Sequence, residues 1–127
     1  MDEQARYEQG MIARREVLGS AYVDRTMQYR NNFNERFQEF ITRYAWGEIW
    51  CQPGLPRHTR SLVTLALMVA LNHEEEFRMH IRAARNNGVT EEEIQELLMH
   101  TAIYCGLPAA NNAFRWAQFA IENEEQS

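Results

Sequence analysis

SLVTLALMVAL, residues 61–71, is the stretch of sequence that decides the fold. At about 100° per residue, its apolar side chains cover nearly every side of a helix. Such a helix must be surrounded by other helices or buried in a subunit contact. It is too short to span a membrane, which takes about 20 apolar residues. We therefore predict that this segment is the central helix of the protein.

Helical patterns fill the chain on both sides of this segment, and stretches rich in glycine and proline separate them. We predict helices near 4–18, 22–31, 33–50, 57–71, 73–86, 91–104 and 109–123. The sequence has no internal repeat, no low-complexity tract and no alternating β-branched run. These features indicate an all-α protein, built as a single compact domain over residues 1–127 with six or seven helices.

Three helix ends have sequence signals of their own. Thr90 followed by Glu93 has the form of a capping box, and Gly88 is suited to end the preceding helix. Asn72 followed by Glu75 has the form of a cap that opens a new helix. We therefore expect a helix boundary at Asn72.

The composition is that of an ordinary globular protein. Hydrophobic residues make up 45% of the 127 residues, enough for one domain with a core. The net charge of -5 argues against nucleic-acid binding, and no apolar run is long enough for a membrane span. The opening residues MDEQARYEQG are polar and acidic, so we expect no secretory signal and a cytoplasmic protein.

All 13 basic residues are arginine, and lysine is absent. Chemistry through a lysine Schiff base, a lysine general base or a pyridoxal phosphate aldimine is therefore excluded for this chain. Arginine binds carboxylates through a bidentate fork, so the chain is suited to hold acids. Cys51 and Cys105 lack the close spacing of a redox pair or a zinc site, and we interpret both as reduced.

An aromatic stripe that ends in a carboxyl group is predicted on the helix at 33–50. The stripe consists of Phe33, Phe37, Phe40 and Tyr44. Glu48 follows Tyr44 by four residues and falls on the same face. Burial there would keep its carboxyl group protonated near neutral pH, as a general acid requires. The alternative is that Glu48 lies at the helix end in water or pairs with an arginine such as Arg43.

His73, Glu76 and His80 are spaced three and four residues apart, so they project from one side of two successive helical turns. A proton-transfer group with an orienting carboxylate can be built in this way. A metal site is a second interpretation, although the order differs from the H-E-x-x-H of zinc proteases, and ordinary surface or core histidines are a third. His58 and His100 have no such neighbours, and we interpret them as structural.

Several longer motifs resemble the carboxymuconolactone decarboxylase family. They are RYAWGEIW at 43–50, RHTRSL at 57–62, HEEEFRMH at 73–80, NGVTEEEIQE at 87–96, TAIYCGLPAANNAFRWA at 101–117 and the leading segment at 7–25. The resemblance covers essentially the whole chain and implies an alkylhydroperoxidase-like helical fold. Peroxide reductases of that superfamily carry a Cys-x-x-Cys pair where His73 and Glu76 stand here. Without these cysteines, disulfide-based peroxide reduction has no chemical basis in this chain.

The resemblance implies a step of protocatechuate breakdown in the β-ketoadipate pathway. The lactone substrate, which carries two carboxylates, loses carbon dioxide and becomes β-ketoadipate enol-lactone. No cofactor and no metal are expected, because the substrate's own ring can delocalise the electrons left behind. Two alternatives remain open, namely another lactone-processing enzyme of the same fold and a non-catalytic helical assembly module.

The resemblance also assigns roles to particular residues. Arg60 is the first candidate for binding a substrate carboxylate, because TRSL places it at the start of the central helix, and Arg57 is the second. His80 is favoured as proton donor or as hydrogen-bond donor to the enolate oxygen. Glu48 would orient His80 or deliver the proton, and His73 competes for the same role. A homo-oligomer, as a homohexamer built from three dimers, is implied as well.

Overall fold

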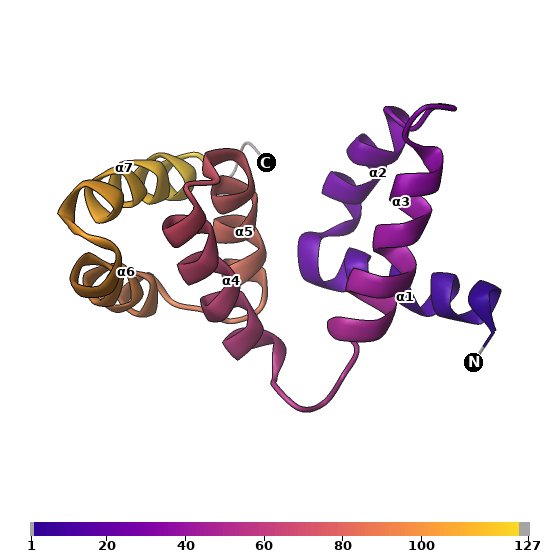
Figure 1. Cartoon of the computed structure of the whole chain (residues 1–127), viewed down its shortest axis with the longest axis horizontal. Coiled ribbons are helices and arrows are strands. Elements are labelled where there is room, and N and C mark those ends of the chain that lie inside the picture. Colours follow the sequence, from indigo (N-terminus) through magenta and orange to yellow (C-terminus); the bar gives the residue numbers. More distant parts are fainter. Residues whose placement is uncertain (1, 125–127) are drawn as a thin grey trace. The chain divides into compact units, whose positions relative to one another are not determined.

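The structure is a computed structural model that describes residues 2–124. The regular elements in that range are all helices (Figure 1), which confirms the all-α prediction. They are α1 (Glu3–Leu18), α2 (Ser20–Gln28), α3 (Glu35–Ile41), the π-helix η1 (Thr42–Ile49), α4 (Arg57–Leu71), α5 (Glu74–Asn86), α6 (Glu91–Cys105) and α7 (Leu107–Glu122). Within these residues, no helix is both long enough and apolar enough to cross a membrane.

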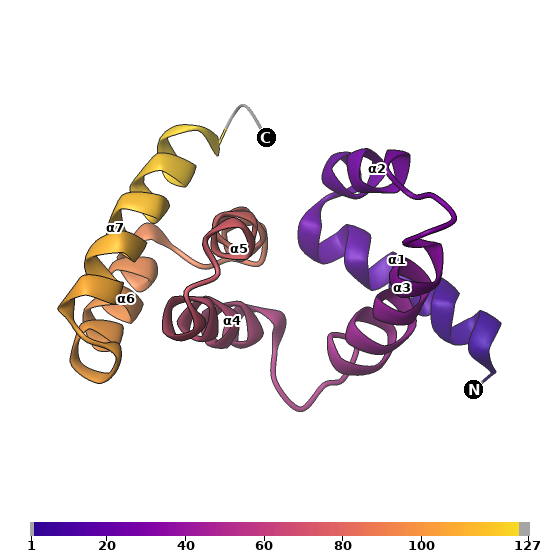
Figure 2. The same ribbon diagram turned by 45° about the horizontal axis from the view of Figure 1, so that its top comes forward.

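The chain divides between Pro56 and Arg57 into two compact units. The first unit contains α1 to η1, and the second contains α4 to α7. In the second unit, α4 packs against α5 and α6, and α7 packs against the same two helices (Figure 2). Because each unit has its own internal packing, a single domain over residues 1–127 stays a prediction.

All four helices of the second unit contribute to one apolar core. Its buried members are Leu65, Val69, Phe77, Ile81, Ala84, Val89, Ile94, Leu98, Ala113, Trp116, Ala117 and Ala120. The Phe77 and Trp116 rings pack edge to face, with their centroids 5.7 Å apart, an arrangement that aromatic pairs favour. The α4 helix buries its Leu65 side, whereas Leu67 and Leu71 are exposed in the chain. The core therefore covers one side of the helix that the sequence placed at the centre.

The junction between α4 and α5 differs from the prediction. Asn72 does not cap α5; the N-cap position is His73, which makes no side-chain capping bond. Asn72 instead adopts a left-handed conformation with φ of 62° and ends α4. The Asn72 amide donates to the Val69 carbonyl (3.2 Å) and the His73 amide to that of Met68 (3.0 Å). This is a Schellman motif, in which asparagine replaces glycine because its side chain tolerates the left-handed region.

Two other helix ends are confirmed. Thr90 and Glu93 form the complete capping box at the start of α6. Gly88 follows α5 with φ of 89°, a conformation that favours glycine. These short signals were readable because cap geometry depends on a few neighbouring residues.

The helix predicted over 33–50 is not one regular α-helix. The α-helix ends at Ile41, and the segment from Thr42 to Ile49 is a π-helix. Its wider hydrogen-bonding pattern reaches five residues back, as in the bond from the Trp50 amide to the Ala45 carbonyl (3.0 Å). Beyond Ile41 the spacing of about 100° per residue therefore no longer applies.

The first unit is organised by a close contact between α1 and η1. A Cβ atom added at Gly10 would lie 1.9 Å from the Thr42 carbonyl oxygen, and one added at Gly47 would lie 2.6 Å from the Arg6 carbonyl oxygen. The absence of a side chain at both glycines lets the two backbones touch. The start of the π-helix is thus held directly against the backbone of α1.

We expect Gly10→Ala to destabilise the fold by about 3 kcal/mol, because its new methyl group would overlap a backbone carbonyl that cannot move freely. Urea unfolding followed by circular dichroism measures the change. Gly54→Ala is the matched control, since no atom lies within 4 Å of a Cβ at that position. Equal midpoints for the two variants would contradict the proposed role of the contact.

Candidate active site

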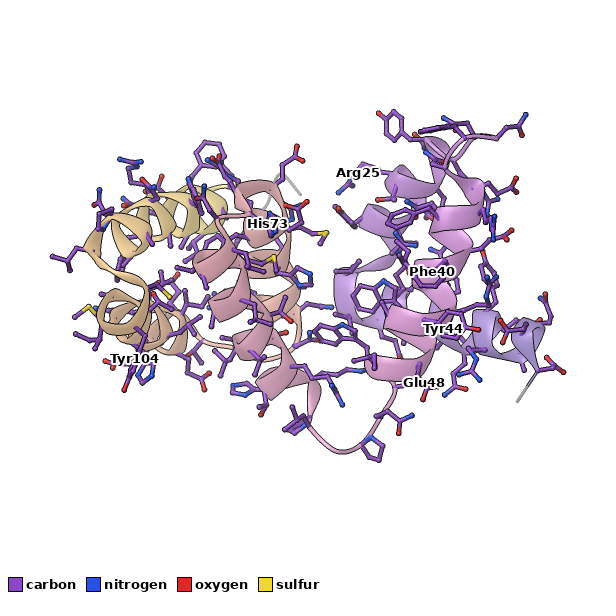
Figure 3. All side chains as sticks on the ribbon, in the orientation of Figure 1. Arg25, Phe40, Tyr44, Glu48, His73 and Tyr104 are labelled. Carbon is purple, nitrogen blue, oxygen red and sulfur yellow. The ribbon has the colours of Figure 1, made fainter. Side chains whose placement is uncertain are left out.

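Glu48 lies near the C-terminal end of η1, the helix that also carries Tyr44, and Phe40 lies on α3 directly before it (Figure 3). Its side chain is 48% exposed, and its carboxylate accepts a hydrogen bond from the Arg6 guanidinium of α1. The apolar burial expected for a stored proton is therefore absent around Glu48 in the chain. The alternative interpretation, a carboxylate paired with arginine, is the one that fits, although the partner is Arg6 and not Arg43.

The aromatic stripe before Glu48 is not enclosed in the chain. Phe33 is 97% exposed, and Phe37 and Phe40 are also exposed. Tyr44 is held by a polar contact, because its hydroxyl donates a hydrogen bond to a Glu3 carboxylate oxygen (2.8 Å). The expectation that these rings bury a carboxyl group is wrong for the isolated chain, because the helix turns its aromatic face to solvent.

Arg14 of α1 was missed by the sequence analysis and is 4% exposed. Its guanidinium donates to the Thr42 hydroxyl (3.1 Å) and to the Gln38 side-chain carbonyl (3.1 Å). Desolvation by burial lowers the pKa of Arg14. These bonds span the point where α3 becomes η1. The spacing of Arg6, Gly10 and Arg14 by four residues was the available signal, since it places all three on one face of α1.

His80 lies on α5 and is 8% exposed. Desolvation lowers its pKa to about 4, and the nearby Glu76 carboxylate opposes that shift in part. At neutral pH the imidazole is therefore uncharged. A neutral imidazole offers one N–H donor and one acceptor nitrogen, which suits hydrogen bonding to a developing oxyanion.

His73 and Glu76, predicted to share a face with His80, are exposed. His73 lies at the junction before α5 (Figure 3), where it occupies the N-cap position. Among residues 2–124, no group of three or more His, Cys, Asp or Glu side chains is arranged to hold a metal ion. The geometry therefore does not support the interpretation of the triplet as a metal site.

Arg57 and Arg60 lie in the first turn of α4, and both are partly buried. A spacing of three residues puts them on one side of the helix. The next residue, Ser61, is buried and accepts a hydrogen bond from the Asn87 side-chain amide (2.9 Å). The first turn of α4 thus carries two guanidinium groups next to a buried and hydrogen-bonded position.

His58, interpreted as structural because it lacked neighbours in sequence, has a charged neighbour in space. Its Nε2 lies 2.8 Å from one carboxylate oxygen of Glu93 and 3.0 Å from the other. Glu93 is the third residue of α6 and the second member of its capping box with Thr90. The contact joins the first turns of α4 and α6, which a sequence pattern cannot reveal because 35 residues separate the two partners.

Comparison with known proteins assigns the chain to a class. Residues 35–119, from the start of α3 into α7, match the carboxymuconolactone decarboxylase family, and the chain belongs to that family. The 4-carboxymuconolactone decarboxylase of Acinetobacter baylyi is 54% identical over 118 residues, which are 93% of this chain and 88% of that protein. The nitrosuccinic acid decarboxylase npaB of Metarhizium robertsii is 42% identical over 92% of this chain and 82% of its own length. A 4-carboxymuconolactone decarboxylase sequence from Pseudomonas putida is 56% identical over 38% of this chain and its full length.

The buried His80 leads to a prediction about pH and stability. In the folded chain it stays neutral down to about pH 4, whereas the unfolded imidazole takes up a proton near pH 6.5. Between these values the unfolded state binds more protons, so the free energy of unfolding falls as the pH is lowered. The difference amounts to about 3 kcal/mol of stability that is present above pH 6.5 and lost toward pH 4.

Urea unfolding at a series of pH values measures this loss. His80→Gln should flatten the stability curve between pH 7 and pH 4, because glutamine does not titrate. The exposed His100 provides the control, and His100→Gln should keep the wild-type slope. If His80→Gln retains that slope as well, His80 is not the group responsible.

Proposed function

We propose that this protein decarboxylates 4-carboxymuconolactone to β-ketoadipate enol-lactone in protocatechuate degradation. The observation that carries the proposal is the 54% identity to the Acinetobacter baylyi enzyme over 93% of the chain. Two relatives that match more than nine-tenths of the chain are both named decarboxylases, which supports carboxy-lyase chemistry in general. The non-catalytic assembly module and a lactone isomerase or hydrolase have no comparable support.

The proposed reaction needs no added electron sink. When the carbon–carbon bond to the leaving carboxylate breaks, its electron pair moves through the ring double bond onto the lactone carbonyl oxygen. A proton then adds to the carbon beside that carbonyl, and the enol-lactone results. The protein must hold the carboxylate that stays, donate a hydrogen bond to the developing enolate oxygen and return one proton.

Arg60 is the proposed main anchor for the carboxylate that stays, with Arg57 as the second. Both guanidinium groups come from one side of the first turn of α4, so they can approach one anionic group together. A cation placed against the leaving carboxylate would stabilise the ground state and slow its loss. The arginines are therefore more useful on the other carboxylate.

His80 is the proposed donor to the enolate oxygen. Its buried and uncharged imidazole would contribute about 2.7–4 kcal/mol of transition-state stabilisation, the range of a single oxyanion donor. Glu48 is proposed to orient His80 or to deliver the proton. Its half-exposed carboxyl group is accessible to water. His73, which is also exposed, is the competing proton source.

Nitrosuccinic acid is the second substrate to test, because of the identity to the npaB protein. Like the lactone, this acid carries two carboxyl groups and a substituent, here a nitro group, that can accept the electrons left by carbon dioxide. Both candidate substrates need the protein to hold one carboxylate and to stabilise the negative charge that forms as carbon dioxide leaves. They differ in whether a ring must fit beside the anchored carboxylate.

Assembly and location are further parts of the proposal. We propose a homo-oligomer, as three dimers, because Val63, Leu67 and Leu71 form an exposed apolar row on α4. We also propose a cytoplasmic location. The two cysteines, Cys51 and Cys105, are free thiols, as a reducing compartment would keep them.

The purified protein should convert enzymatically generated 4-carboxymuconolactone at a rate far above its spontaneous decay. Loss of the lactone and release of carbon dioxide measure the reaction, with nitrosuccinate assayed in parallel. The rate should survive exhaustive chelation and should not increase with added nucleotide, flavin or pyridoxal phosphate. Turnover of nitrosuccinate alone would replace the proposed substrate, and restoration by a single metal after chelation would contradict the cofactor-free mechanism.

Substitution should separate binding from chemistry. Arg60→Ala should mainly raise KM, because a carboxylate anchor acts equally in the ground and transition states, and Arg60→Lys should recover little. His80→Ala should mainly lower kcat, by about 100-fold to 1,000-fold, because its partner charge exists only as carbon dioxide leaves. Steady-state kinetics on folded variants measures both.

The same assay tests the proton source. Glu48→Gln should lower kcat by about 100-fold if Glu48 delivers or orients the proton. A near-wild-type kcat would show that Glu48 has no role in proton transfer and is only a surface carboxylate paired with Arg6. A near-wild-type kcat in His80→Ala would transfer the donor role to His73.

A further inference from the structure

The contact between His58 and Glu93 connects two helix starts within the second unit. The imidazole Nε2 lies 2.8 Å and 3.0 Å from the two carboxylate oxygens. His58 is the second residue of α4, and Glu93 is the third residue of α6. A side chain in the first turn of α4 is therefore fastened to the neighbouring helix.

The Glu93 carboxylate is itself held in place by α6. It accepts a hydrogen bond from the Thr90 amide (2.9 Å), and the Thr90 hydroxyl accepts one from the Glu93 amide (3.1 Å). The hydrogen bond from His58, followed by the one from Thr90, holds the pKa of Glu93 below its ordinary value. The carboxylate is thus a fixed and charged acceptor for the imidazole.

The first turn of α4 needs such a fastening. Residues 52–56, which precede it, are exposed turns and irregular chain. The first N–H groups of a helix have no acceptor within the helix, so a helix start frays more easily than its middle. Deeper in α4, Ser61 is held by its bond from Asn87. The contact between His58 and Glu93 restrains α4 one turn earlier than the Ser61 hydrogen bond does, at the residues on either side of His58.

Those residues include Arg57 and Arg60. At about 100° per residue, Arg57 and Arg60 lie within one side of the helix, whereas His58 is turned away from Arg60 by about 160°. His58 can therefore restrain the first turn of α4 from a different side of the helix, without competing for the anion that the arginines bind.

We propose that His58, through Glu93, is a positioning residue for the substrate-binding arginines Arg57 and Arg60. The proposal rests on the proposed function, in which these arginines hold the carboxylate that stays on the substrate. His58 touches neither substrate nor reacting atoms. It reduces the freedom of the helix turn from which both guanidinium groups extend, so its loss weakens carboxylate binding more than the chemical step.

The kinetic test uses 4-carboxymuconolactone and the full-length protein. His58→Ala should raise KM about tenfold and leave kcat within about twofold, because a loosened anchor is lost equally from ground and transition states. His58→Gln should restore most of the affinity, since its side-chain amide can still donate to Glu93. His100→Ala, which removes an exposed imidazole beside Tyr104 on α6, should leave both constants unchanged.

Glu93→Gln tests the acceptor without removing the helix cap, because glutamine also serves at this position of a capping box. It should raise KM less than His58→Ala does. The double variant should be no worse than His58→Ala alone, because both changes break one interaction. Additive effects would show that the two residues act independently and would overturn the proposal.

Trypsin provides a readout that does not depend on turnover. The chain has no lysine, so trypsin cuts only after arginine, and Arg57 and Arg60 lie in the turn in question. His58→Ala should speed cleavage after these two residues several-fold, whereas His100→Ala should not. Unchanged cleavage together with unchanged KM, or a loss confined to kcat, would overturn the positioning role.

The two proposals fail in different ways. If the wild-type protein does not turn over the lactone, the proposed function fails, and with it the assignment of Arg57 and Arg60 as anchors. The cleavage pattern then still decides whether His58 fastens the turn. If the wild type is active and His58→Ala matches it in KM and in protease resistance, the positioning proposal alone is wrong.

Discussion

Close approach of helix backbones over small side chains is the constraint on which both units depend. In the first unit, Gly10 and Gly47 leave no side chain between α1 and η1. In the second unit, α7 packs against α5 and α6. Its buried alanines, which include Ala113 and Ala117, allow a close approach. Close packing of this kind transmits any added volume into the backbone. The positions of the side chains that flank these contacts are therefore determined by the partner helix.

Glu48 and His80 lie in opposite environments within this packing. One turn to either side of Gly10, Arg6 reaches Glu48 and Arg14 reaches Thr42, so α1 holds both ends of η1. Glu48 stays half-exposed and paired with a cation. His80, on the closely packed α5, is buried and neutral. The first environment leaves the carboxylate in contact with water, and the second strengthens a hydrogen bond by excluding water.

Prediction from the sequence succeeded for most local signals, with the cap expected at Asn72 as the exception, and failed where the structure depends on the partner helix. The capping box at Thr90 is local, and it was predicted correctly. The π-helix was not, because a search for a period of 3.6 residues assumes the α-helical hydrogen-bonding pattern, whereas η1 has a wider one. The spacing made His80 a candidate whose role stays a prediction, and the partner of His58 could not be found from the sequence. For Glu48 the sequence left burial and exposure open, since one aromatic face does not show whether anything covers it, and the structure supports the exposed, arginine-paired alternative.

Because the chain has no lysine, the proposed mechanism depends on arginine to bind and orient the substrate. Without lysine, the chain cannot form a lysine imine as an electron sink, and in the proposed reaction the lactone ring takes that role. In that reaction the protein contributes orientation, interactions that strengthen as charge moves, and the returned proton. Orientation by a guanidinium is only as good as the backbone that carries it. In the proposed mechanism, a rigid first turn in α4 therefore matters as much as the charge of Arg57 or Arg60.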